Sequence, residues 1–130
     1  MEIKVAKTAG FCFGVNRAVE LTYGLLAEGR RVATLGPLIH NPQAFVADSV
    51  PQVPDGYEVV IRSHGVPRSV YDELEARGIA YHDATCPFVQ KIQRIAAQAE
   101  KEGAVLLVAG DKTHPEVQGI VGHTRGEVFV

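Results

Sequence analysis

Residues 58–87, EVVIRSHGVPRSVYDELEARGIAYHDATCP, contain two apolar segments separated by one helical segment. The apolar segments, Glu58 to Arg62 and Ile79 to His82, are short and rich in branched residues, as in strands buried on both faces. Between them Pro67 occupies a position that favours the start of a helix, and Gly78 ends the helical pattern. Such a unit predicts two parallel strands that are joined by a helix.

Apolar segments of the same kind recur outside this stretch and alternate with helical patterns. We expect further strands at Ile3 to Ala6, Arg31 to Leu35, Val105 to Ala109 and Val128 to Val130. The segment Asp48 to Gly56 contains two prolines and is predicted to be a loop. The alternation predicts an α/β fold, with a parallel or mixed sheet flanked by helices on both faces.

The helical segments are marked by apolar residues on one face and by the residues that start or end them. Apolar positions from Val15 to Leu26 precede Gly29, and those from Val89 to Ala99 precede Gly103. Proline is favoured at the first position of a helix because its missing N–H has no partner there. We therefore expect helices to begin also at Pro42, Pro67, Pro87 and Pro115.

Length and charge restrict the class of protein. The 130 residues are enough for one domain with a core, or for part of a longer protein. Thirteen Lys and Arg against 15 Asp and Glu give no electrostatic reason to expect a nucleic acid or an anionic membrane as partner. No apolar run approaches the roughly 20 residues of a membrane helix, and we expect the N-terminus to form a strand and not a secretory signal. We expect a cytoplasmic protein, in which two cysteines are more often thiols or metal ligands than a disulfide.

Chemically active side chains follow five predicted strands in succession. Ligands of open α/β sheets bind beyond the carboxyl ends of the strands, so these side chains are expected to share one edge. The set consists of Cys12, His40, His64, Cys86, His114 and Glu116. Asn41, Cys86 and His114 directly precede prolines, and so lie near predicted helix starts, whose free N–H groups favour anions. Several helix starts at one edge would hold a phosphate or a diphosphate.

We do not assign a chemical role to the remaining histidines or to the polar residues near them in sequence. We expect His82 to be structural and Asp83 to orient the turn before Cys86, while His123 has no predicted partner. The side chains of Tyr71, Asp72, Glu73 and Glu75 are expected to form a solvated helix face.

Three kinds of chemistry suit two cysteines and several histidines. A zinc site is one, although structural zinc sites usually draw their ligands in close pairs and these cysteines lie 74 residues apart. A thiol nucleophile with a histidine base is another, but it leaves one cysteine without a role. An iron–sulfur cluster fits better, because distant cysteines converge on such clusters, although it needs a further ligand. A metal- or anion-binding module without catalysis, and a scaffold without any ligand, stay open.

Five short motifs, read in order, resemble one family. They are GFCFGVNRAV (residues 10–19), GPLIHNP (36–42), IRSHGV (61–66), DATCPFV (83–89) and THPEVQG (113–119). This order is similar to that of the 4-hydroxy-3-methylbut-2-enyl diphosphate reductase family, iron–sulfur enzymes of the non-mevalonate isoprenoid pathway. The resemblance implies that Cys12 and Cys86 are two of the three thiolate ligands of a 4Fe–4S cluster. It also implies that His40, His64 and His114 contact the diphosphate and that Glu116 supplies protons.

The resemblance also implies the reaction and the wider architecture. An allylic diphosphate would lose its hydroxyl group by reductive dehydroxylation, with electrons from ferredoxin or flavodoxin, giving isopentenyl and dimethylallyl diphosphate. The family has three similar α/β domains in a pseudo-symmetric arrangement, of which residues 1–85 would form the first and 86–130 part of the second. The third cysteine would lie beyond Val130, so the chain alone is expected to be inactive. A strand that the family pattern leads us to expect near Asp48 to Pro54 is missing from this sequence.

Overall fold

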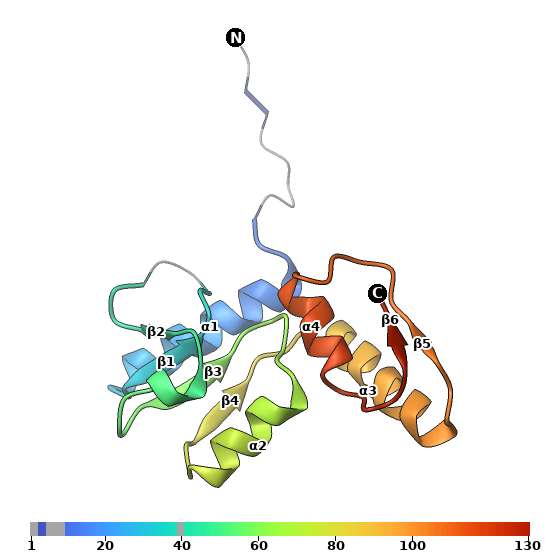
Figure 1. The fold of residues 1–130 in the computed structure, drawn as a ribbon. Coiled ribbons are helices and arrows are strands. Elements are labelled where there is room, and N and C mark those ends of the chain that lie inside the picture. Colours follow the sequence, from blue (N-terminus) through green and yellow to red (C-terminus); the bar gives the residue numbers. More distant parts are fainter. Residues whose placement is uncertain (1–2, 5–9, 39–40) are drawn as a thin grey trace.

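Four parallel strands in the order β2-β1-β3-β4 form the main sheet of the computed structural model (Figure 1). The structure describes residues 3–4, 10–38 and 41–130. The strands are β1 (Val32–Leu35), β2 (Phe45–Ala47), β3 (Glu58–Ile61) and β4 (Tyr81–Asp83). Because all four run in the same direction, their carboxyl ends lie at one edge of the sheet.

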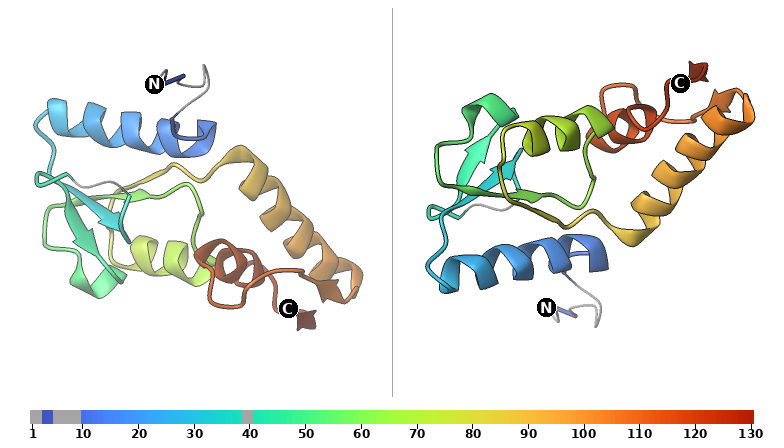
Figure 2. Two further views of the ribbon diagram at one scale, coloured as in Figure 1. Left: turned by 90° about the horizontal axis from the view of Figure 1, so that it is seen from above. Right: turned by 90° about the horizontal axis from the view of Figure 1, so that it is seen from below.

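Each face of this sheet is covered by a helix, as Figure 2 shows. Helix α1 (Phe13–Ala27) packs on one face through a cluster formed by Ala18, Leu25, Val32, Val60 and Ala84. Helix α2 (Arg68–Ala76) packs on the other face, where the fully buried Leu74 joins Leu35, Val59 and Ile61. The predicted fold class, an α/β fold with a parallel sheet between helices, is confirmed.

The C-terminal part of the chain lies beside the main sheet (Figure 1). It consists of α3 (Pro87–Glu102), α4 (Pro115–Val121) and a second pair of parallel strands, β5 (Leu106–Leu107) and β6 (Val128–Phe129). The helices begin at Pro87 and Pro115, as predicted, and α2 begins one residue after Pro67. The division into domains at residues 85 and 86 stays a prediction.

The segment between β1 and β3 differs from the prediction. No helix begins at Pro42: the Asn41 side chain accepts a hydrogen bond from the backbone N–H of Gln43 at 2.8 Å and forms a turn. The short edge strand β2 follows at once, since Phe45 and Val46 favour extended backbone. The loop from Asp48 to Gly56 holds one turn of 3₁₀ helix, η1 (Val50–Gln52), and no strand.

Two parts of the prediction fall on residues that the structure does not describe. Val5 and Ala6 of the expected N-terminal strand lie outside the described residues, and so does His40. Within the described ranges, no helix has the length and apolar character needed to cross a membrane.

Candidate functional site

Helices α1 and α3 approach each other with their starts at the carboxyl edge of the sheet (Figure 2). The two cysteines lie at these helix starts. Both are free thiols, and each is an N-cap residue, Cys12 of α1 and Cys86 of α3. Gly14 packs directly on Cys86, because a Cβ added to Gly14 would lie 2.8 Å from the Cys86 Cβ and 3.0 Å from its Sγ. Only glycine permits this approach, so the first turn of α1 holds Cys12 on the same side of the fold as Cys86.

The turn before Cys86 is held by a network of hydrogen bonds. Asp83 accepts from the backbone N–H of Thr85 at 2.9 Å and from its hydroxyl group, as predicted for the residue that orients this turn. Arg17 reaches across from α1 and donates to the carbonyl oxygen of Thr85 at 3.0 Å. The backbone N–H of Cys86 donates to the carbonyl oxygen of Ser63 at 2.9 Å, in the loop after β3. The network thus connects both helix starts to the end of β3.

The loop after β3 and the start of α4 bring two histidines together. The rings of His64 and His114 are in edge contact, with centroids 5.6 Å apart. The Nδ1 of His114 accepts the backbone N–H of Glu116 at 3.2 Å, which caps α4. In the neutral ring this bond places the proton on Nε2, which is then available as a donor.

The His64 ring is packed differently. Its Nδ1 is buried and has no hydrogen-bond partner among the residues that the structure describes. Burial lowers the pKa of His64, and the nearby Arg62 and His114 lower it further, while the Glu116 carboxylate acts in the opposite direction. The structure therefore brings His64 and His114 into contact, with Glu116 near enough to act on His64, and the roles of these three residues stay predictions.

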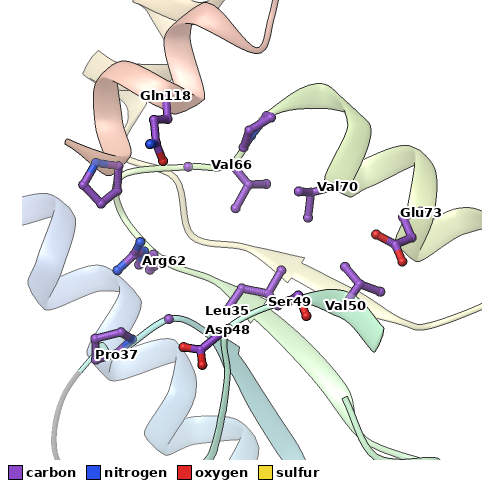
Figure 3. Close-up of a pocket in the computed structure, with 14 residues that line it drawn as sticks. Leu35, Pro37, Asp48, Ser49, Val50, Arg62, Val66, Val70, Glu73 and Gln118 are labelled. Carbon is purple, nitrogen blue, oxygen red and sulfur yellow. The ribbon is translucent and has the colours of Figure 1, made fainter. Parts of the chain in front are cut away.

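A cavity of 340 Å³ opens beside this cluster, between the ends of the strands and helices α2 and α4 (Figure 3). Apolar side chains, including Leu35, Val66 and Val70, line much of it. Figure 3 shows Arg62 and Glu73 on opposite sides of the cavity.

The structure gives the remaining ionisable residues clear contacts. His82 and Glu58 connect β4 and β3, with 2.7 Å between Nε2 and Oε2, and His123 contacts the carbonyl oxygen of Gly119 at 2.7 Å. Tyr71 was expected on a solvated face, but it is half-buried against the core and donates to Asp83 at 3.2 Å. Burial is the main cause that raises the pKa of Tyr71 to about 12.

Two arginines of the site were not predicted from sequence. Arg17 lies five positions after Cys12 in the first motif, and Arg62 directly follows the buried strand β3. Arg62 could have been found from the sequence, because a charged residue that follows a buried strand directly lies at the carboxyl edge of the sheet. The contacts of Arg17 with the turn before Cys86 need the three-dimensional structure.

The two cysteines are the right type of ligand for an iron–sulfur cluster, but two are fewer than such a cluster needs. Such clusters are held by cysteine thiolates. Cys12 is exposed and Cys86 is half-buried, and the glycine contact brings their helices together. Within the described ranges, no three His, Cys, Asp or Glu side chains lie close enough to hold a metal ion by themselves. The chain therefore offers two thiols, and an iron–sulfur cluster at this site would need further ligands.

Fold and site together define a parallel α/β chain with two cysteines, two histidines and a glutamate near the carboxyl edge of its sheets. The chain belongs to the LytB protein family, whose family model matches residues 3–130. The family resemblance predicted from the five motifs is thereby confirmed.

Similar proteins include 4-hydroxy-3-methylbut-2-enyl diphosphate reductases from several bacteria. The one from Citrifermentans bemidjiense is 42% identical over 139 residues, which cover 100% of this chain and 49% of the relative. The one from Caldanaerobacter subterraneus subsp. tengcongensis is 38% identical and covers 100% of this chain and 50% of the relative. The chain thus spans about half the length of the curated relatives it matches.

Solved structures agree with these relatives. A structure of (E)-4-hydroxy-3-methyl-but-2-enyl diphosphate reductase, described as the terminal enzyme of the non-mevalonate pathway, has a TM-score of 0.80 and 40% identity. The match covers 97% of this chain and 49% of that one. A structure of the E-1-hydroxy-2-methyl-but-2-enyl-4-diphosphate reductase from Plasmodium falciparum has a TM-score of 0.80 and 25% identity, covering 95% of this chain and 42% of the other.

Proposed function

We propose that this chain acts as the N-terminal half of a 4-hydroxy-3-methylbut-2-enyl diphosphate reductase. The observation that carries the proposal is the contact of Gly14 with Cys86, which puts both thiols on one side of the fold. The neighbouring His64–His114 pair supports it, as do relatives of that name matched along the whole chain.

In this proposal Cys12 and Cys86 hold two irons of a 4Fe–4S cluster, and a third thiolate comes from the other half of the protein. When bound, the cluster supplies electrons and a Lewis acid for the hydroxyl group of the substrate. Arg17 holds the backbone before Cys86 in position through its hydrogen bond to Thr85. The electron donor is ferredoxin or flavodoxin, and the protein works in the cytoplasm.

The histidines and the glutamate act on the two ends of the substrate. His114 donates from Nε2 to a diphosphate oxygen, and His64 and His40 contact the same group. Glu116 supplies a proton, so that the hydroxyl leaves as water. Two electrons and two protons balance the reaction: one proton leaves in the water and the other is added to the carbon skeleton. The products are isopentenyl and dimethylallyl diphosphate.

A chimera tests this proposal. Residues 1–130 are fused to the C-terminal half of the Citrifermentans bemidjiense relative, and the protein is reconstituted anaerobically with iron and sulfide. We expect the chimera to convert 4-hydroxy-3-methylbut-2-enyl diphosphate in the presence of reduced ferredoxin or flavodoxin, and the unfused chain to be inactive.

The controls are the iron content and the visible absorption of the chimera, together with circular dichroism to establish folding. A folded chimera with a complete cluster that leaves the substrate unchanged would contradict the proposal. Such a result, together with retained binding of pyrophosphate, would instead favour an anion-binding module without catalysis.

A further inference from the structure

Arg62 lies at the carboxyl end of β3, and its side chain packs against the backbone of Gly36, which directly follows β1. Its guanidinium group packs on Gly36, where an added Cβ would lie 2.8 Å from both Cζ and Nη1 of Arg62. Gly36 has a φ of 76°, a conformation that side chains other than glycine rarely adopt. Both the conformation and the missing Cβ of Gly36 therefore make room for the arginine.

The charge of Arg62 is partly buried, and the described part of the chain holds no counterion for it. Its Nε is buried and has no hydrogen-bond partner among the described residues, and no carboxylate in the described ranges forms an ion pair with it. Burial lowers the pKa of Arg62, and no charge of the described residues offsets this effect. A cation taken out of water without a partner destabilises a fold, so its presence here calls for an anion that binds later.

The residues around Arg62 indicate on which side of it an anion would bind. The charge of Arg62 acts on His64, whose own Nδ1 is buried without a partner in the described part of the chain. His114 contacts the His64 ring. On the cavity side, Asp48 and Glu73 would repel an anion. The favourable place for negative charge is therefore on the histidine side of Arg62.

We propose that Arg62 binds the diphosphate group of the substrate, together with His64 and His114. This inference rests on the proposed function and adds a ligand to it. A guanidinium group can donate two parallel hydrogen bonds to a phosphate, which fixes the orientation of the group as well as its position. The substrate then provides the counterion that the described residues of the chain do not supply.

The effect of Arg62→Met on folding separates this role from a structural one. Methionine keeps an unbranched chain of similar length but removes the buried charge. Without ligand, the Arg62→Met chain should therefore have a melting temperature at least as high as that of the unchanged chain. If Arg62 were a structural residue, the same substitution would lower the melting temperature.

Inorganic pyrophosphate serves as the probe, with calorimetry and thermal unfolding of the 130-residue chain as readouts. We expect pyrophosphate to bind and to raise the melting temperature, and Arg62→Met to weaken binding roughly tenfold or more. Arg62→Lys, which keeps the charge but loses the paired hydrogen bonds, should bind with intermediate affinity. Arg31→Met is the matched control, because Arg31 lies at the opposite end of β1, stacked on Tyr57.

The inference is wrong if the unchanged chain fails to bind pyrophosphate, or if Arg62→Met binds it as tightly as the unchanged chain does. The same variant in the chimera separates this result from the proposed function. Turnover with an unchanged KM in the Arg62→Met chimera would overturn the role of Arg62 and leave the reductase intact. A folded, cluster-loaded chimera without turnover would overturn the reductase, while Arg62-dependent pyrophosphate binding would still stand.

Discussion

Replacement of Cys86 by serine is expected to reduce the iron and acid-labile sulfide of the reconstituted chimera to near background. The ligand in such clusters is the thiolate, and a serine hydroxyl group keeps its proton at neutral pH and binds iron poorly. The substitution exchanges one small side chain for another, so the contact with Gly14 and the start of α3 should persist. Cys12→Ser should have the same effect, since it removes another ligand of the same cluster.

Iron and sulfide analysis, with the visible absorption of the cluster, measures this loss. Circular dichroism and the melting temperature of the apoprotein show whether each variant is folded. Full iron content in both single variants would contradict a ligand role for either cysteine. Binding of zinc with no visible absorption in the unchanged chimera would indicate a different kind of metal site.

Glu116→Gln is expected to reduce turnover by the chimera by about 10²–10⁴-fold, the usual contribution of a general acid. The amide keeps a similar shape, and the hydrogen bond from the backbone N–H of residue 116 to His114 does not involve the side chain. The iron content and the binding of pyrophosphate should therefore be close to those of the unchanged chimera.

The rate of reduction at saturating substrate and electron donor measures this effect. Glu127→Gln serves as the control for loss of one carboxylate, because Glu127 is exposed and lies outside the site. A rate for Glu116→Gln equal to that of the control would exclude Glu116 as the proton donor.

Much of the fold followed from local patterns. Strands β1 and β3 and helix α1 were predicted because buried apolar runs and a one-sided apolar helix face are visible over short windows. A strand was also predicted at Ile79 to His82, but β4 begins two residues later and covers Tyr81–Asp83, which are only partly buried. The positions of Cys86 and His114 as N-caps followed from the proline after each of them. These predictions depend on neighbours in sequence, which is why they could be made without a structure.

The parts that were missed depend on long-range contacts. Pro42 has the local features of a helix start, but an Asn41 turn and the pairing of Phe45 with Ala33 on β1 produce a strand instead. Tyr71 looked solvated in its helix, yet it packs on a core to which the sheet contributes. Local sequence does not contain such partners.

In the candidate site, too, the residue types are visible in the sequence, while the contacts between distant residues are not. Gly14 can be read in the sequence two positions after Cys12, but its contact with Cys86, 72 positions away, depends on the folded structure. Likewise, the charge of Arg62 was visible in the sequence, while its burial without a counterion among the described residues depends on how the loops after β1 and β3 fold together. The position of His40 relative to these groups stays a prediction.

Cross-linking of the two thiols in the 130-residue chain tests most directly whether Cys12 and Cys86 lie together. A short bifunctional thiol reagent is added to the reduced chain, in buffer and in denaturant, and the products are identified by mass after proteolysis. We expect one intramolecular link between the cysteine peptides to form much faster in the native chain than in the unfolded chain. Two separate single adducts in the native chain, with linkage only after unfolding, would contradict a shared site.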